Sequence, residues 1–183
     1  MRLGRLDKRA EIISLDADLA KVSHGSRWVA IRAKELADAP AAVGLRTSAM
    51  VEVRARYSAD LVPGRYLRSG ARLLHITSAR DPMGTGAEMV LSCDELVGEA
   101  GQALPLSAAP RPCRVSLQHN APLLDELGRV TQYMTRAEVA LIEAGRLQAG
   151  QDQLRVCGVL YNIIDYDDRS DDGVVRGLWL EPL

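Results

Sequence analysis

The sequence predicts a mainly β protein built from two small antiparallel β-barrel or sandwich domains in tandem, the second with one α-helix. Two observations point to this fold class. Residues 49–57 alternate apolar and charged side chains, which is the period of a half-buried strand. The two halves of the chain also end in the same pattern, namely an apolar strand, a turn with Asp and Gly, and a second apolar strand. We therefore expect a repeated β domain.

The two terminal patterns align at an offset of 87 residues. The aligned pairs are Leu74 with Tyr161, Ile76 with Ile163, Asp81 with Asp168, and Leu91 with Leu178. Duplication of one small domain explains this alignment. Two unrelated hairpins that share ordinary hairpin composition would produce it as well, so both explanations stay open at this point.

A change in composition separates the halves. Residues 97–112 contain three Pro, two Gly and several Ala, with neither a helical nor a strand period. We expect a first β domain at 1–97, a linker at 98–111 and a second β domain at 112–183. Domains of this size lie near the limit at which one core is stable by itself.

The remaining elements follow from local patterns. Further strands are expected at residues 9–15, 114–118 and 153–166, the last either continuous or broken at Gly158; residues 28–36 fit both periods and favour a strand. Thr135 and Glu138 have the spacing of a capping box, and apolar residues follow at helical spacing. These features predict one helix of about 13 residues that ends near Gly150.

Composition excludes several functional classes. The formal net charge of -1 and the pI near 6.3 argue against a strongly basic nucleic-acid binder. No apolar stretch approaches the roughly 20 residues that span a bilayer, and the basic N-terminus lacks the apolar segment of a secretory signal. We therefore expect a cytoplasmic protein without membrane contact. Cys93, Cys113 and Cys157 lack zinc-site spacing and are expected to be buried, reduced thiols.

No pattern predicts catalysis, a cofactor or a metal. The three His residues are scattered, there is no Ser nucleophile elbow, and the glycines at 84 and 86 fit a hairpin turn. An acidic cluster comprises Asp165, Asp167, Asp168, Asp171 and Asp172. It lacks the order of a calcium-binding loop, so we interpret it as solvated turn carboxylates, with adventitious calcium binding as the alternative.

An arginine-rich face is the strongest electrostatic feature of the first half. Its members are Arg54, Arg56, Arg65, Arg68 and Arg72, with Tyr57 and Tyr66 nearby. Such a face fits a DNA-facing surface that tracks a phosphate backbone, and it fits a salt-bridged protein interface equally well.

The first half, over residues 3–96, resembles the head-to-tail joining proteins of long-tailed bacteriophages, which are also called head-closure or head-tail adaptor proteins. The resemblance rests on the order and spacing of residues 4–9, 28–30, 51–57, 63–64, 72–76 and 80–82. Leu74 stands where an aromatic residue is common in that family. The second half is similar to a related neck type through residues 158–163 and the closing strand that ends near Leu180.

The resemblance implies a structural virion protein of the phage neck, assembled in the host cytoplasm. Small antiparallel barrels would form a six-fold or twelve-fold ring below the portal protein, seal the filled head and dock a tail terminator or other neck protein. Double-stranded DNA would pass through the ring without sequence-specific binding. Residues 16–27 and 119–131 would be interface or lumen loops.

Two alternatives remain. The runner-up is a single-stranded nucleic-acid-binding module that uses Arg54, Arg56 and Tyr57. The third is a metal-dependent enzyme built around the acidic cluster.

Overall fold

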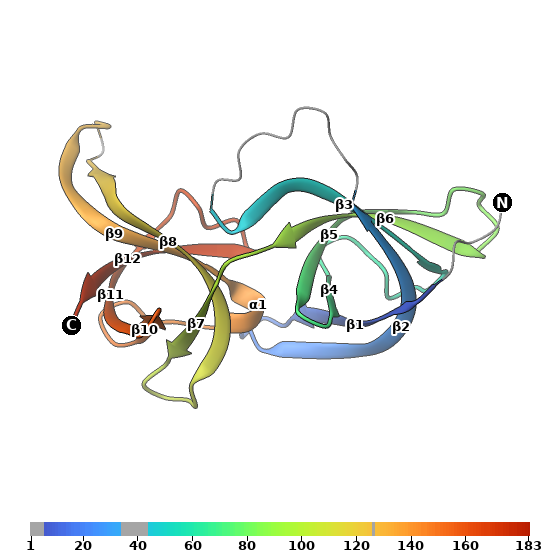
Figure 1. Cartoon of the computed structure of the whole chain (residues 1–183), viewed down its shortest axis with the longest axis horizontal. Coiled ribbons are helices and arrows are strands. Elements are labelled where there is room, and N and C mark those ends of the chain that lie inside the picture. The colour runs from blue at the N-terminus through green and yellow to red at the C-terminus, as the bar shows by residue number, and fades with distance from the viewer. Residues whose placement is uncertain (1–5, 34–43, 126) are drawn as a thin grey trace. The chain divides into compact units, whose positions relative to one another are not determined.

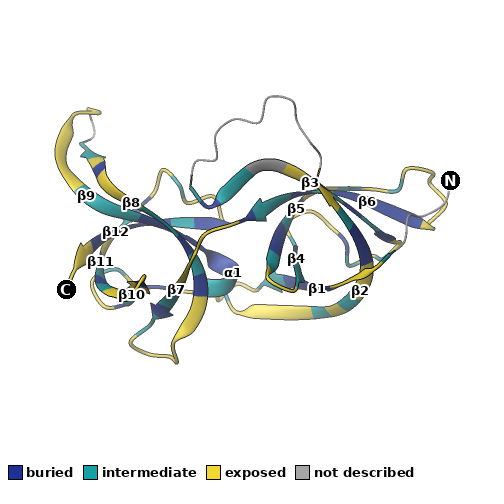
Figure 2. Cartoon of the chain, in the orientation of Figure 1, coloured by how far each residue is buried: buried dark blue, intermediate teal, exposed yellow. Residues whose placement is uncertain are grey.

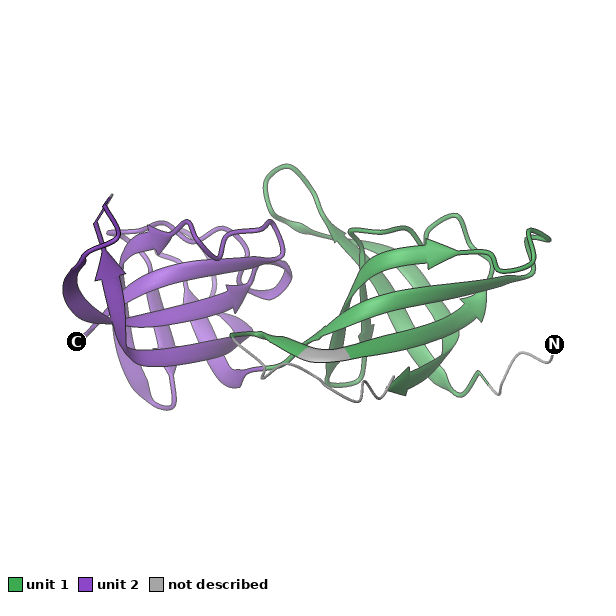
Figure 3. Cartoon of the chain, turned by 90° about the horizontal axis from the view of Figure 1, so that it is seen from above, with its two compact units in different colours: residues 1–97 green, residues 98–183 purple. Residues whose placement is uncertain are grey.

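The structure, a computed structural model, describes residues 6–33, 44–125 and 127–183. The chain divides into two compact units, residues 1–97 and 98–183 (Figure 3). Each unit is a closed barrel of six antiparallel strands (Figure 1). The predicted fold class, two small β-barrels in tandem with one helix in the second, is therefore confirmed.

In the first barrel the strands pair in the order β1-β2-β3-β6-β5-β4, and β4 pairs back onto β1 to close the sheet. The strands are β1 (Lys8–Leu15), β2 (Lys21–Ala33), β3 (Arg46–Arg56), β4 (Tyr66–Ser69), β5 (Arg72–Arg80) and β6 (Glu88–Leu96). Residues 28–33 are extended, which confirms the strand that the sequence favoured over a helix there. The rest of that predicted segment, residues 34–36, lies outside the described residues.

In the second barrel the order is β7-β8-β9-β12-β11-β10, again closed by pairing between the first and fourth strands. The elements are β7 (Glu99–Leu104), β8 (Arg111–Leu124), β9 (Val130–Ala140), α1 (Leu141–Ala144), β10 (Gln153–Val156), β11 (Val159–Asp167) and β12 (Val175–Pro182). The predicted strand at 153–166 is broken by a turn at Cys157 and Gly158.

The expected linker at 98–111 is wrong, because residues 99–104 form β7, the first strand of the second barrel. Pro105 and Pro110 flank the turn that leads into β8. Gly101 serves close packing, since a Cβ atom there would lie 2.5 Å from Cγ2 of Val115. Proline and glycine therefore mark a hairpin and a tight strand contact here.

The predicted 13-residue helix is also wrong. Residues 130–140 are the strand β9, and α1 has only four residues. Ala137 and Val139 belong to the core of the barrel, and Arg136 and Glu138, which alternate with them along β9, form a hydrogen bond with each other. This alternation satisfies the period of a strand, and pairing with β8 and β12 outweighs the local capping signal.

The two barrels share their register as well as their strand order. Ile76 faces Cys93 and Ile163 faces Leu180, and a bulge follows each isoleucine. The offset is 87 residues along β4, β5 and β6. It changes to 91, 86 and 84 along β1, β2 and β3, as shown by the pairs Ile12/Ala103, Val29/Val115 and Ala55/Val139. Chance similarity between two hairpins does not account for a common closure, so the architecture favours duplication.

Buried residues recur along the strands of both barrels (Figure 2). Their side chains form one hydrophobic core in each barrel. One cross-strand row shows how the two cores differ. In the first barrel the row is Ile12, Leu67 and Leu74, and in the second it is Ala103, Leu154 and Tyr161. A smaller side chain on one strand accompanies a larger one two strands away, which keeps the interior filled.

The equivalent core positions provide a test of the two barrels. Leu91→Ala and Leu178→Ala each remove a fully buried side chain, so each should lower the free energy of unfolding by about 2–5 kcal/mol. Denaturant unfolding measures the loss, with Leu106→Ala as the control because Leu106 is 79% exposed. A loss at Leu178 no larger than at Leu106 would contradict the assigned core.

Candidate interaction surfaces

The five arginines of the first half do not form one face. Arg54 and Arg56 lie on β3, and Arg68 lies on β4. In the closed order β1-β2-β3-β6-β5-β4, two strands separate β3 from β4 in either direction, so these side chains are on opposite sides of the barrel. Arg72 lies on β5, and its side chain donates a hydrogen bond to Glu95 of the neighbouring strand β6. The predicted single surface is therefore wrong.

Carboxylates neutralise most of these arginines. Arg54 Nε donates to Glu52 Oε1 at 2.8 Å, and this hydrogen bond raises the pKa of Arg54. Arg72 donates through Nε and Nη2 to both carboxylate oxygens of Glu95, at 2.7 Å each, which raises its pKa likewise.

Arg65 and Arg68 also lie beside acidic groups. Arg65 Nη1 donates to Asp60 Oδ1 at 3.1 Å, and this bond is the main reason for the lowered pKa of Asp60. Arg68 faces Glu11 across the β1–β4 pairing, and its charge contributes to the lowered pKa of Glu11, which is due mainly to a hydrogen bond from Ser23.

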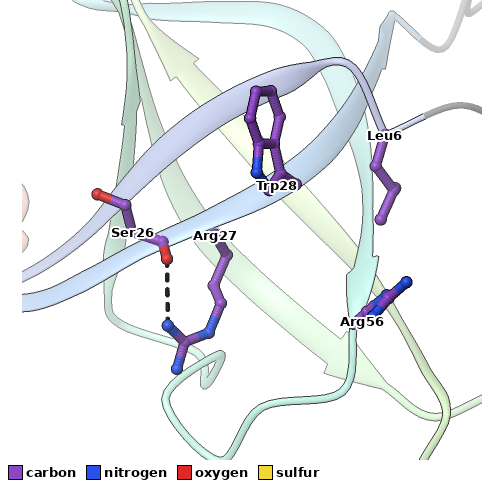
Figure 4. A pocket seen from close by; sticks show the side chains of 5 residues that line it. All are labelled: Leu6, Ser26, Arg27, Trp28 and Arg56. Atoms are coloured by element: carbon purple, nitrogen blue, oxygen red, sulfur yellow. Dashed lines mark hydrogen bonds between the residues drawn. The ribbon is translucent and has the colours of Figure 1, made fainter.

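Arg56 differs from the other four. It is exposed, and no ion pair joins it to a residue within the described part of the chain. It lines an open hollow of about 490 Å³ together with Leu6, Ser26, Arg27 and Trp28 (Figure 4). We call this the Trp28 hollow. The predicted arginine-rich face contained Arg56 but not Trp28 or Arg27. Their proximity to Arg56 depends on the β2–β3 register, in which Val29 faces Ala55.

The Trp28 hollow combines an aromatic surface with two cations. Trp28 is 58% exposed, which is unusual for a large apolar side chain on a strand. Arg27 Nη1 donates to the Ser26 carbonyl at 3.1 Å, and Nη2 lies 3.7 Å from Asp60 Oδ2. The hollow therefore offers apolar contact beside positive charge that is only partly neutralised.

A second exposed surface is the β8–β9 arm, which comprises residues 119–134. β7 pairs with β8 only up to Val115, and β12 pairs with β9 only from Thr135. Beyond these residues the two strands pair with each other alone, and the arm extends away from the second barrel (Figures 1 and 2). Leu127, Val130 and Tyr133 on the arm are 76%, 49% and 66% exposed.

The acidic cluster is a structured turn. Asp167 is 6% exposed and accepts a hydrogen bond from Arg136, so the expectation that all five carboxylates are solvated is wrong for this residue. Asp171 binds Arg176 at 2.8 Å, and Asp172 accepts from the backbone N–H groups of Val174 and Val175 at 2.9 Å each. These hydrogen bonds stabilise one conformation of the turn between β11 and β12.

Within residues 6–33, 44–125 and 127–183, no three His, Cys, Asp or Glu side chains are placed to hold a metal ion together. In the same residues no helix has the length and apolar character to cross a membrane.

The three thiols differ in environment. Cys93 and Cys113 are buried as expected, and burial raises the pKa of Cys93 to about 12 and that of Cys113 to about 11. Cys157 is exposed, contrary to the expectation, because it lies in the turn between β10 and β11. Its Sγ donates to Glu99 Oε2 at 3.1 Å, and this hydrogen bond is the main reason for its raised pKa.

This difference predicts selective alkylation. In the folded protein at pH 8, iodoacetamide should modify Cys157, whereas Cys93 and Cys113 should react only after unfolding. Glu99→Gln removes the carboxylate that disfavours the thiolate, so the pKa of Cys157 should fall and alkylation should accelerate. Mass spectrometry after timed alkylation measures both effects. A slower reaction in Glu99→Gln would show that the Glu99 contact does not control this thiol.

Comparisons with known proteins assign no family to this geometry. The chain matches no protein-family model, and no curated protein or solved structure matches it. The barrels, the neutralised arginines and the two exposed surfaces are the basis for a functional proposal.

Proposed function

We propose that this chain is a structural subunit of a bacteriophage neck. Copies of it would form a ring that closes the DNA-filled head below the portal and connects it to the tail. The observation that carries this proposal is the β8–β9 arm, a two-stranded ribbon with exposed apolar side chains on a barrel that is otherwise closed.

The exposed edges and apolar side chains of the β8–β9 arm favour contact with a protein partner. A two-stranded ribbon without a third strand or a packed face is marginally stable in water. Its outer edges carry backbone groups without a ladder partner among the described residues, and Leu127, Val130 and Tyr133 place apolar area in solvent. Packing against a neighbouring subunit would bury that area, and aromatic side chains such as Tyr133 are enriched in interfaces.

The charge distribution supports passage of DNA through such a ring. Free cations on a lumen wall would bind phosphates and hinder sliding of the duplex. Here Arg54, Arg65 and Arg72 already bind carboxylates, and the whole chain has a formal net charge of -1. Arginines neutralised in this way suit a subunit of a conduit better than a nucleic-acid clamp.

Ring assembly would also stabilise the fold. Each unit has a small core of mainly aliphatic side chains, and domains of this size bury a modest fraction of their surface. Burial between subunits adds stability by mass action, because the assembled state binds only folded protein.

Solution mass tests the proposal. Native mass spectrometry of the full chain, alone and mixed with portal rings, should detect a six-fold or twelve-fold assembly in at least one of the two samples. A monomer in both samples would overturn the proposal.

A variant of the β8–β9 arm tests whether the arm forms the interface between subunits. The double change Leu127→Ser and Tyr133→Ser removes exposed apolar area, so it should abolish the assembly while the thermal midpoint of the isolated chain stays within a few degrees of the wild type. Leu106→Ser and Met83→Ser are controls, since these residues are 79% and 68% exposed but lie outside the arm. Equal assembly of the arm variant and the controls would remove the arm from the interface.

A second candidate, a single-stranded nucleic-acid-binding module, is favoured by one observation. Trp28 offers an exposed ring on which a base can stack, with Arg27 and Arg56 beside it for a phosphate. In this case an oligonucleotide gel shift should weaken steeply as salt rises, and Arg56→Glu should abolish it. Ring assembly that is insensitive to salt, without any gel shift, would favour the neck protein.

A further inference from the structure

The two barrels differ at one equivalent place on their outer surface. By register, Trp28 of β2 corresponds to Arg114 of β8, and Arg56 of β3 corresponds to Ala140 of β9. Trp28 is 58% exposed and Arg56 is exposed, whereas the Arg114 side chain is 17% exposed and Ala140 is fully buried. The second barrel is therefore covered where the first barrel is open.

The cover in the second barrel is α1, which follows directly after β9. Glu143 of α1 accepts hydrogen bonds from Arg114 through the backbone N–H at 3.0 Å, Nε at 2.9 Å and Nη2 at 3.0 Å. Leu141, Ile142 and Ala144 of α1 are buried. A short segment with one carboxylate and aliphatic neighbours thus covers this place.

The corresponding connection of the first barrel, residues 57–65 between β3 and β4, covers less of the outer surface. It places Leu61 in the core and brings Asp60 to 3.7 Å from Arg27, but Trp28 stays exposed and Arg56 has no ion pair within the described part of the chain. The result is the Trp28 hollow of about 490 Å³, which lies within the usual range of binding-site volumes.

We propose that the Trp28 hollow binds a short acidic, aliphatic peptide segment of a partner protein. The segment's carboxylate binds the guanidinium of Arg56, and its aliphatic side chains pack on the ring of Trp28 and on Leu6. Tryptophan and arginine are the residue types that dominate the energy of protein interfaces. This inference goes beyond the proposed ring and does not depend on it, because it rests on the comparison of the two barrels.

The charges around the hollow favour a single carboxylate over a nucleic-acid chain. Asp60 lies beside Arg27, and its lowered pKa keeps it ionised. Glu88 faces Arg56 across the β3–β6 pairing and lies 3.8 Å from Arg54. A run of phosphates would bring several negative charges close to these carboxylates, whereas a peptide segment with one carboxylate brings a single negative charge and meets less repulsion.

The chain supplies both the probe and the reporter for the test. The probe is a capped peptide of residues 139–145, which contains α1 and has Glu143 as its single charged residue, and it is compared with the same peptide carrying Gln at the Glu143 position. The reporter is Trp28, since the other tryptophan, Trp179, is only 6% exposed and contributes little to quenching by acrylamide. The Trp28→Phe variant confirms the source of the signal.

The proposal predicts that the acidic peptide protects Trp28 of the full chain from acrylamide in a saturable way. Binding should weaken about tenfold or more with the Gln peptide and with Arg56→Glu, because each change removes a charged hydrogen-bond partner. Arg111→Glu, an equal charge change on an exposed residue of β8, should leave binding unchanged.

Three results would overturn the proposal: no protection at about 1 mM peptide, equal binding of the Glu and Gln peptides, or protection by an oligothymidine probe but not by the peptide. Ring assembly is measured separately by mass, so failure of the peptide to bind and failure of the ring are distinguishable.

Discussion

Closure of each six-stranded sheet, by pairing of its first strand with its fourth, is the constraint on which the rest of this structure depends. A closed sheet has no lateral edges in its barrel section, and it encloses one row of inward side chains from every strand. The two cores satisfy this constraint with different residues, as Ile12 and Leu74 against Ala103 and Tyr161 show. Closure therefore requires a filled interior in both barrels, so core residues change in a compensating way, whereas the connections and the outer surface can change more freely.

Function is therefore to be sought where the two copies of the barrel differ. α1 covers the second barrel at the place where the first barrel keeps the Trp28 hollow open. The second barrel also carries the β8–β9 arm. Both surfaces expose apolar or aromatic side chains, and the Trp28 hollow adds Arg56 and Arg27; aromatic residues and arginine are enriched in surfaces that bind protein. The carboxylates that bind Arg54, Arg65 and Arg72 act in the same direction, because they weaken attraction for phosphates.

Strand composition and the 87-residue offset predict the fold class, since inward residues repeat with a period of two and the duplicated strands keep their register. Local signals failed where pairing overrode them: Thr135 and Glu138 have capping-box spacing but lie on β9, and Pro105 and Pro110 bound a hairpin turn. The arginine face failed for another reason. Whether Arg54 and Arg68 share a side depends on strand order, and Trp28 meets Arg56 only through the β2–β3 register. Neither relation is readable from one sequence.

The central proposal is that this chain joins the filled head to the tail. Electron microscopy of particles assembled without this chain tests that claim most directly. The account predicts filled or leaking heads that accumulate beside free tails, with joined particles restored when the chain is supplied. Complete tailed particles with retained DNA in its absence would contradict it.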